Sequence, residues 1–211
     1  DVKAYIDQAV LRLSRDSVGL RDFALYANGG RVIRELTGVP QDDVLVLPPM
    51  DNSPNASLTD DMRVGNCWKF PEEAGQFGFR TSEMLYPTHV TIDHIPLEIA
   101  ADIGQAPRSM ALWAAIDGSR NTETLNAISA SPHSRIPDHL GRTQPRFNEN
   151  LTFILLTTFT YDIYSPNNVQ TFPIEYVVVD ARIFFGVFVL DILSNWGGDA
   201  TCLYRVRIHG E

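Results

Sequence analysis

The chain has 211 residues, the size of one large domain or of two small ones. Its 17 Lys and Arg residues against 26 Asp and Glu residues give a formal net charge of −9 at pH 7. Binding to nucleic-acid phosphates or to anionic lipid needs basic surface, so we expect neither partner for this domain. Apolar residues make up 44% of the chain, which is enough for a core and excludes general disorder.

The two cysteines, Cys67 and Cys202, exclude other classes. Two are too few for a disulfide-dense scaffold or for a structural zinc site with four cysteine ligands. They can form one bridge or remain two unrelated buried thiols, and composition leaves both possibilities open.

Membrane and secretory segments are not visible in the sequence. No leader pattern is present, and the longest apolar run, 183–190 with one glycine inside it, is far shorter than the ~20 residues of a membrane helix. We therefore expect a soluble domain, with any membrane attachment through regions outside this chain.

Residues 1–20 are predicted to contain a helix. Its apolar residues follow the 4-3-4 spacing of a coiled-coil seam: Val2, Ile6, Ala9 and Leu13. A helix this short is marginal in isolation. It needs either the surface of its own domain or copies of itself from other chains, and the pattern alone does not decide between them.

A turn and a long flap follow this helix. Asn28-Gly29-Gly30 predicts a helix end or tight turn with positive φ. Residues 34–63 carry four prolines and two acidic clusters, so they predict a long loop or flap. Within it, only 44–47 has the pattern of a short strand.

From Asn66 onward the pattern is that of β-structure. In 88–95, Val90, Ile92 and His94 share one face, and the intervening residues share the other. Many short strands, with no helical pattern after residue 30, predict a mainly β fold, an antiparallel β-sandwich. The expected strands are 77–80, 88–95, 110–116, 151–161, 171–174, 181–193 and 203–209.

Residues 118–150 interrupt this pattern with Ser, Asn, Pro, His and Arg and few large apolar residues. We expect an inserted surface loop. An interdomain linker is the alternative, which we disfavour because the residues after it lack a core of their own without the earlier strands.

Chemical motifs are scarce, and an enzyme is not expected. The chain has none of the common nucleophile, zinc-protease or phosphate-loop patterns. Thr59, Asp60, Asp61 and Asn66 form an oxygen-rich loop that is either a solvated acidic turn or a site for a hard cation. His94 is either a core histidine or a hydrogen-bonding residue at an interface. Asn55 and Asn150 begin glycosylation sequons, which matter only in a secretory compartment.

Several long motifs together resemble the SUN domain, the luminal domain of inner-nuclear-membrane SUN proteins. The similar segments are an R-D-F-A-L and N-G-G opening at 21–30, G-N-C-W-K-F at 65–70, P-T-H-V-T-I-D-H-I-P at 87–96, S-N-W-G at 194–197 and T-C-L-Y-R-V-R-I-H-G-E at 201–211. The resemblance covers about 5–33, 64–117 and 151–211. It implies a SUN domain over 21–211, a galactose-binding-like jelly roll preceded by a coiled-coil-type helix.

The resemblance also implies a function. SUN domains are homotrimers on a coiled-coil stalk, which would place Val2, Ile6, Ala9 and Leu13 at the trimer-facing seam. They lie in the perinuclear lumen and bind the C-terminal tail of KASH proteins, and this LINC complex bridges nucleoskeleton and cytoskeleton. The alternatives are an endoplasmic-reticulum SUN-like protein without a KASH partner and a carbohydrate-binding β-sandwich. The last predicts exposed aromatic platforms.

The resemblance assigns residues to the tail site. A lid at 34–57 would pair its strand, Val44, Leu45, Val46 and Leu47, with the tail by β-augmentation. His94 and Tyr204 would line the pocket for the terminal carboxylate. Gln105 and Ala200 stand where the family often has a serine and a second tyrosine. Gln105 can still donate an amide hydrogen.

The family pairs its two conserved-motif cysteines within one chain, so the resemblance implies a Cys67–Cys202 disulfide in an oxidising lumen. No cysteine then remains to cross-link the tail, and binding should be noncovalent. The loop before G-N-C-W holds a monovalent cation, potassium or sodium, in the family. Thr59, Asp61, Asn66 and the Tyr204 backbone are the matching positions, and no other cofactor is expected.

Overall fold

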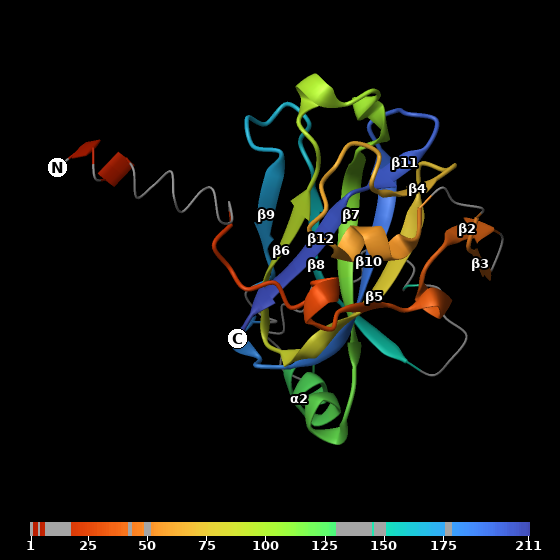
Figure 1. Ribbon diagram of the computed structural model, residues 1–211. Helices are drawn as coiled ribbons and strands as arrows, with labels where there is room; N and C mark the ends of the chain where they lie inside the picture. The colour runs from red at the N-terminus through yellow and green to blue at the C-terminus, as the bar shows by residue number, and fades with distance from the viewer. Residues whose placement is uncertain are drawn as a thin grey trace.

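The computed structural model describes residues 2–3, 5–6, 18–41, 44–48, 52–129, 145, 151–175 and 179–211. These residues form antiparallel sheets packed face to face (Figure 1). The expected mainly β, jelly-roll sandwich is confirmed. No helix in this described part is long and apolar enough to span a membrane.

The larger sheet has five strands in the order β1-β5-β10-β7-β8. Its central strands are rich in aromatic and β-branched residues, which pack well on a pleated surface. The sheet is buried on both faces, with Phe77, Phe79 and Phe188 in the main core and Trp113 and Val189 in a second cluster. The strands are β1 (Arg31–Val32), β5 (Gly75–Leu85), β10 (Phe185–Asn195), β7 (Pro107–Ile116) and β8 (Thr152–Thr160).

The opposing layer has three strands in the order β12-β6-β9. Val90 and Ile92 of β6 and Val206 and Ile208 of β12 enter the main core. Beside this layer β11 (Thr201–Leu203) pairs with β4 (Trp68–Phe70). The one strand expected over 203–209 is therefore two strands separated at Tyr204. The bounds are β12 (Arg205–Gly210), β6 (Pro87–Asp93) and β9 (Val169–Pro173).

The second face of the β6–β12 pair is buried as well, and the chain segment 21–25 contacts it at β12. The Phe23 backbone N–H donates to the Ile208 carbonyl (2.9 Å). His209 donates through Nδ1 to the Arg21 carbonyl (2.8 Å), and its Nε2 accepts from the Thr91 hydroxyl (2.8 Å). Polar side chains on this face are thus enclosed and hydrogen-bonded rather than solvated.

The prediction of no helix after residue 30 is wrong at α2 (Ser119–Ser129), the helix at the bottom of Figure 1. The helix is mostly polar, and Leu125 is its contact with the core. Its sequence therefore lacks the helical spacing of apolar residues from which a helix is predicted. It occupies the first third of the expected loop 118–150. Apart from residue 145, the remainder lies outside the described residues.

The N-terminal helix is described only at residues 2–3 and 5–6, where the chain is helical and Val2 and Ile6 are exposed. Ala9 and Leu13 lie outside the described residues, so the stalk seam stays a prediction. Further on, Gly29 adopts φ 110° at the end of a 3₁₀ turn, which confirms the expected positive-φ turn.

The expected flap contains a hairpin of β2 (Val39–Gln41) and β3 (Val44–Val46). It stands at the right of Figure 1, beyond β4. A bridge between Gly38 and Gln76 joins its base to β5, and Val39 is buried. The short strand predicted at 44–47 is confirmed over Val44–Val46.

Candidate functional site

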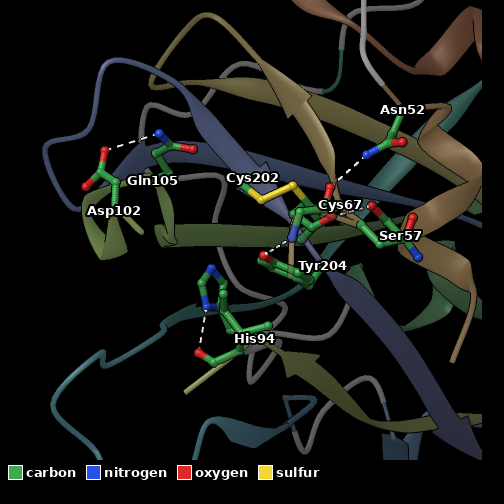
Figure 2. The surroundings of a disulfide bond; sticks show 12 residues. Asn52, Ser57, Cys67, His94, Asp102, Gln105, Cys202 and Tyr204 are labelled. Atoms are coloured by element: carbon green, nitrogen blue, oxygen red, sulfur yellow. Dashed lines mark hydrogen bonds between the residues drawn. A yellow bond between two sulfur atoms is a disulfide. The ribbon is translucent and has the colours of Figure 1, made fainter. Parts of the chain in front are cut away.

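Cys67 and Cys202 form a disulfide (Figure 2). Cys202 lies in β11 opposite Lys69 of β4, so the covalent bond adds to a ladder that already joins these two segments. Their Cα atoms are 5.5 Å apart. The bridge implied by the resemblance is confirmed.

Strand register brings His94 and Tyr204 together. Arg205 of β12 pairs with Asp93 of β6. Tyr204 directly precedes Arg205 and His94 directly follows Asp93, so the antiparallel register sets Tyr204 opposite His94. Their rings lie edge to face with centroids 4.8 Å apart. His94 is 2% exposed and Tyr204 4% exposed.

His94 is a buried neutral acceptor. Its Nδ1 lies 3.0 Å from the Ile95 carbonyl, which can only accept, so Nδ1 carries the proton and Nε2 does not. Nε2 is buried without a partner in the described part of the chain. Burial lowers the pKa of His94, although the hydrogen bond to Ile95 partly opposes this.

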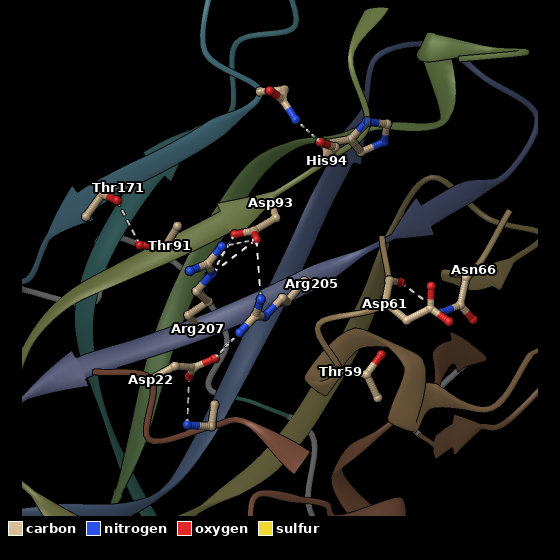
Figure 3. A network of polar contacts seen from close by, with 12 residues as sticks. Asp22, Thr59, Asp61, Asn66, Thr91, Asp93, His94, Thr171, Arg205 and Arg207 are labelled. Carbon is tan, nitrogen blue, oxygen red and sulfur yellow. Dashed lines mark hydrogen bonds and ion pairs between the residues drawn. The ribbon is translucent and has the colours of Figure 1, made fainter. Parts of the chain in front are cut away.

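The two sequence neighbours of the pair, Asp93 and Arg205, belong to a buried ionic network with Arg207 and Asp22 (Figure 3). Arg207 donates through Nε to both Asp93 oxygens (2.9 and 3.0 Å). Arg205 donates to Asp22 (2.8 Å), and its other terminal nitrogen lies 3.8 Å from Asp93. Two guanidinium groups thus face two carboxylates, which keeps the cluster neutral where charge is costly to bury.

The Tyr204 hydroxyl accepts a hydrogen bond from the Gly65 backbone N–H (3.0 Å), so its own proton is available to a ligand. Gln105 lies in the 3₁₀ turn Ile103–Gln105, and its amide donates to Asp102 (3.2 Å). Among the described residues, no hydrogen bond joins Gln105 to His94 or Tyr204. Ala200 is buried, and its carbonyl accepts from Asn195 (3.0 Å).

Thr59, Asp61 and Asn66 share one loop in Figure 3. The Asn66 amide donates to the Asp61 carbonyl (2.8 Å), and the Thr59 hydroxyl donates to Ala56 (2.8 Å). Arg63 donates through Nε to both Asp61 oxygens (2.8 and 3.0 Å), and this contact lowers the pKa of Asp61.

The donors in this loop are hard oxygens, which suit potassium or sodium. Arg63 already neutralises Asp61, but their ion pair is exposed and such pairs exchange readily. The residues therefore fit a monovalent cation if Asp61 turns away from Arg63. Within the described ranges, no three His, Cys, Asp or Glu residues are grouped to hold a metal ion.

The lid strand β3 offers a place for an added strand. In the described part of the chain it pairs with β2 alone, so its other edge is unpaired. Val44 is 53% exposed, and Leu45, Val46 and Leu47 are half-buried. An edge of this kind is a template for β-augmentation.

Sequence reasoning missed the ionic network. Its signal was present, because Asp93 and the Arg205-x-Arg207 pattern place charges inside strands that otherwise read as buried. Sequence reasoning also missed an aromatic group at the sandwich end. Tyr164 is 74% exposed and meets Trp196 edge to face, with ring centroids 5.7 Å apart.

Comparison with known proteins decides the family. Residues 47–137 and 143–211 match the model of the Sad1 / UNC-like C-terminal family, which is more than half of the chain. The chain belongs to this family of SUN domains. The match includes most of the stretch 118–150.

Curated relatives support this membership. SUN domain-containing protein 2 of Mus musculus is 28% identical over 221 residues, covering 100% of this chain and 26% of that protein. The nuclear migration and anchoring protein unc-84 of Caenorhabditis elegans is 24% identical, covering 100% of this chain and 17% of that protein. This chain thus spans about a quarter or less of the length of these relatives.

Solved structures with the same fold are distant in sequence. A family 32 carbohydrate-binding module of Streptococcus pneumoniae EndoD superposes with a TM-score of 0.54 at 11% identity, covering 90% of this chain and 100% of the module. Allantoicase of Saccharomyces cerevisiae gives a TM-score of 0.51 at 11% identity, covering 91% and 43%. These likenesses show the jelly-roll fold alone.

Replacing both cysteines by alanine should lower the free energy of unfolding by about 5 kcal/mol, because the bridge closes a loop of 135 residues in the unfolded chain. Urea denaturation of the wild type and of Cys67→Ala/Cys202→Ala measures the loss. Reductant should lower the urea concentration at the unfolding midpoint of the wild type and leave that of the double variant unchanged. Equal midpoints without reductant would contradict the prediction.

Stability should fall on acidification below pH ~6.5, the ordinary pKa of histidine. Burial lowers the folded-state pKa values of His94 and His209. The unfolded chain therefore takes up protons first, and the stability present above pH ~6.5 is lost as the pH falls towards the folded pKa. The loss approaches about 1.4 kcal/mol per pH unit for each histidine.

Urea titrations at pH 7.5, 6.5 and 5.5 measure this slope. His209→Gln removes one of the two titrating groups, so its slope should be smaller than that of the wild type. Superimposable pH profiles of unfolding free energy for the two proteins would show that His209 is not responsible.

Proposed function

We propose that this SUN domain binds the C-terminal tail of a KASH protein in the perinuclear lumen and thereby anchors nuclei to the cytoskeleton. The observation that carries the proposal is the His94–Tyr204 ring pair beside the disulfide, together with family membership. The unpaired edge of β3 supplies the second contact. A disulfide suits an oxidising lumen, and the relative unc-84 is named for nuclear migration and anchoring.

The hydrogen-bond donors of the site decide how a tail carboxylate is held. Neutral His94 presents a hydrogen-bond acceptor at Nε2, so this atom cannot donate a hydrogen bond to a carboxylate. Tyr204 has a free hydroxyl proton, because its oxygen accepts from Gly65. Gln105 becomes a second donor when its amide gives up the hydrogen bond to Asp102 and donates to the ligand instead. Both donors are neutral, and binding is noncovalent because both cysteines are already bonded.

The assembly that we propose is a homotrimer on a coiled-coil stalk, with its membrane anchor in the parent protein outside this chain. The apolar residues Val2 and Ile6 are exposed within the single chain. Burying these two side chains, with Ala9 and Leu13, against equivalent helices would stabilise a trimer. The tail would then bind at the boundary of neighbouring subunits at the inner nuclear membrane.

A carbohydrate-binding module is a second candidate, favoured by one observation. Exposed Tyr164 is supported by Trp196, over which the Arg108 guanidinium lies at 4.5 Å. A rigid exposed ring of this kind is a suitable platform for the apolar face of a sugar. An endoplasmic-reticulum SUN-like protein without a KASH partner would have neither sugar nor tail affinity.

Tail binding should depend on a free carboxylate. A fluorescent KASH C-terminal peptide is titrated in its acid and C-terminal amide forms, and the amide should bind about tenfold or more weakly, because a hydrogen bond to a charged group contributes roughly 1.5–3 kcal/mol. Tyr204→Phe keeps the ring pair and should reduce that difference, because Gln105 then remains as the other proposed donor. Tyr86→Phe, at a tyrosine that packs on Phe184, is the matched control.

Equal affinity of the two peptide forms would contradict a carboxylate pocket. Absence of binding to both forms would contradict the KASH proposal as a whole. A galactose-containing glycan array with a Tyr164→Ala control would then separate the carbohydrate alternative from the endoplasmic-reticulum one.

A monovalent cation should strengthen tail binding, since the loop 59–66 donates its Gly65 N–H to Tyr204. The same titration in potassium chloride, sodium chloride and choline chloride at equal ionic strength measures the effect. Asp61→Asn should weaken the dependence, and Asp60→Asn in the same loop is its control. Equal affinities in all three salts would contradict a role for the ion.

A further inference from the structure

A polar groove lies beside the lid, and neither His94 nor Tyr204 lines it. Its cavity has a volume of about 460 Å³. Three separate segments line it: the chain from Tyr26 to Arg34, which includes β1, then Leu47 directly after β3, and residues 52–55 near the end of the lid. The lining residues are Tyr26, Arg31, Val32, Arg34, Leu47, Asn52, Ser53, Pro54 and Asn55. We call this cavity the lid groove.

The charge of the lid groove is opposite to that of the domain. Two arginines line it, and among the described residues no Asp or Glu does, although the whole chain carries a net charge of −9. An anionic group entering this cavity meets no carboxylate there. Elsewhere on such an acidic surface the same group would be repelled.

The two guanidinium groups are available in different ways. Arg31 stacks over the Tyr26 ring at 4.4 Å and donates through Nη1 to Tyr26 and Gly30 carbonyls (2.9 and 2.7 Å). These contacts fix its plane, and its other N–H groups have no partner among the described residues. Arg34 is exposed, and its guanidinium makes no hydrogen bond or ion pair with any described residue. A fixed planar donor beside a free one suits a carboxylate.

The position of the lid groove connects it with the tail. Leu47, which lines the groove, follows directly after β3. A peptide strand paired along the free edge of β3 would leave that edge at the Leu47 end, and the residues flanking the strand would enter the groove. The hairpin and the segment before it lie side by side at the right of Figure 1.

We propose that the lid groove binds an acidic side chain, Asp or Glu, that flanks the lid-paired strand of the same peptide. This inference rests on the proposed function and adds the chemistry of its partner. The carboxylate lies between Arg31 and Arg34. Because both arginines are at the rim of the interface, their charge acts mainly on the association rate and its salt dependence.

The experiment uses two KASH tail peptides with the same free C-terminus. One carries two glutamates beside the lid-pairing segment, and the other carries two glutamines there. Wild-type domain should bind the glutamate peptide about three- to tenfold more tightly, as expected for exposed charge pairs. Stopped-flow association in low and high salt should show the difference shrinking as salt screens the charges.

The variant Arg31→Gln/Arg34→Gln should bind both peptides equally, with the affinity that wild type has for the glutamine peptide. Arg120→Gln/Arg182→Gln makes the same change of charge away from the groove and should keep the preference. Thermal unfolding of both variants confirms that they fold.

The inference alone would be overturned if wild type bound both peptides equally, or if Arg31→Gln/Arg34→Gln retained the glutamate preference. A shared loss of preference in both double variants would likewise overturn it, because net charge would then explain the effect. Failure of wild type to bind either peptide would overturn the proposed function and this inference together.

Discussion

The register of β6 against β12 is the constraint on which the rest of the site depends. It sets Arg205 opposite Asp93, and the two residues join Arg207 and Asp22 in a buried network. Such a cluster is tolerable only when every charge has a partner, and removal of one partner typically costs about 3–5 kcal/mol. A slip by one residue would turn these charges into the apolar core, so the network specifies one pairing.

Tyr204 is held from both sides of this arrangement. Cys202, two residues before it, is fixed covalently to Cys67, and Arg205, directly after it, is fixed by Asp22. The segment that supplies Asp22 follows the predicted stalk, so the same ion pair joins the stalk end to the strand of the pocket. The lid differs, because the bridge at Gly38 and the burial of Val39 hold its base while β3 keeps an open edge.

The sequence predicted those strands and turns whose conformation is determined by residues close together along the chain. Gly29 takes its positive φ because the turn there needs one, and the strands at 88–95 and 110–116 follow from their β-branched and apolar residues. The Cys67–Cys202 pairing came from family resemblance, since spacing cannot choose partners. Helix α2 was missed because its polar sequence has no stripe. The enclosed polar face of β6 and β12 was missed because the segment that contacts it at β12, 21–25, is more than 180 residues away along the chain.

The spatial distribution of charge likewise could not be predicted from the sequence. A net charge of −9 argues against phosphate-rich partners over the whole surface, yet it says nothing of where the seventeen cations gather. Arg31 and Arg34 reach one cavity because β1 lies beside the lid end at Leu47, a juxtaposition that only the fold creates. An acidic domain with a groove that no described carboxylate lines would repel an acidic peptide in most orientations and attract it in the one that reaches Arg31 and Arg34. On the proposed function, electrostatics would thus select the orientation of the tail, while the Tyr204 pocket and the β3 edge would supply most of its affinity.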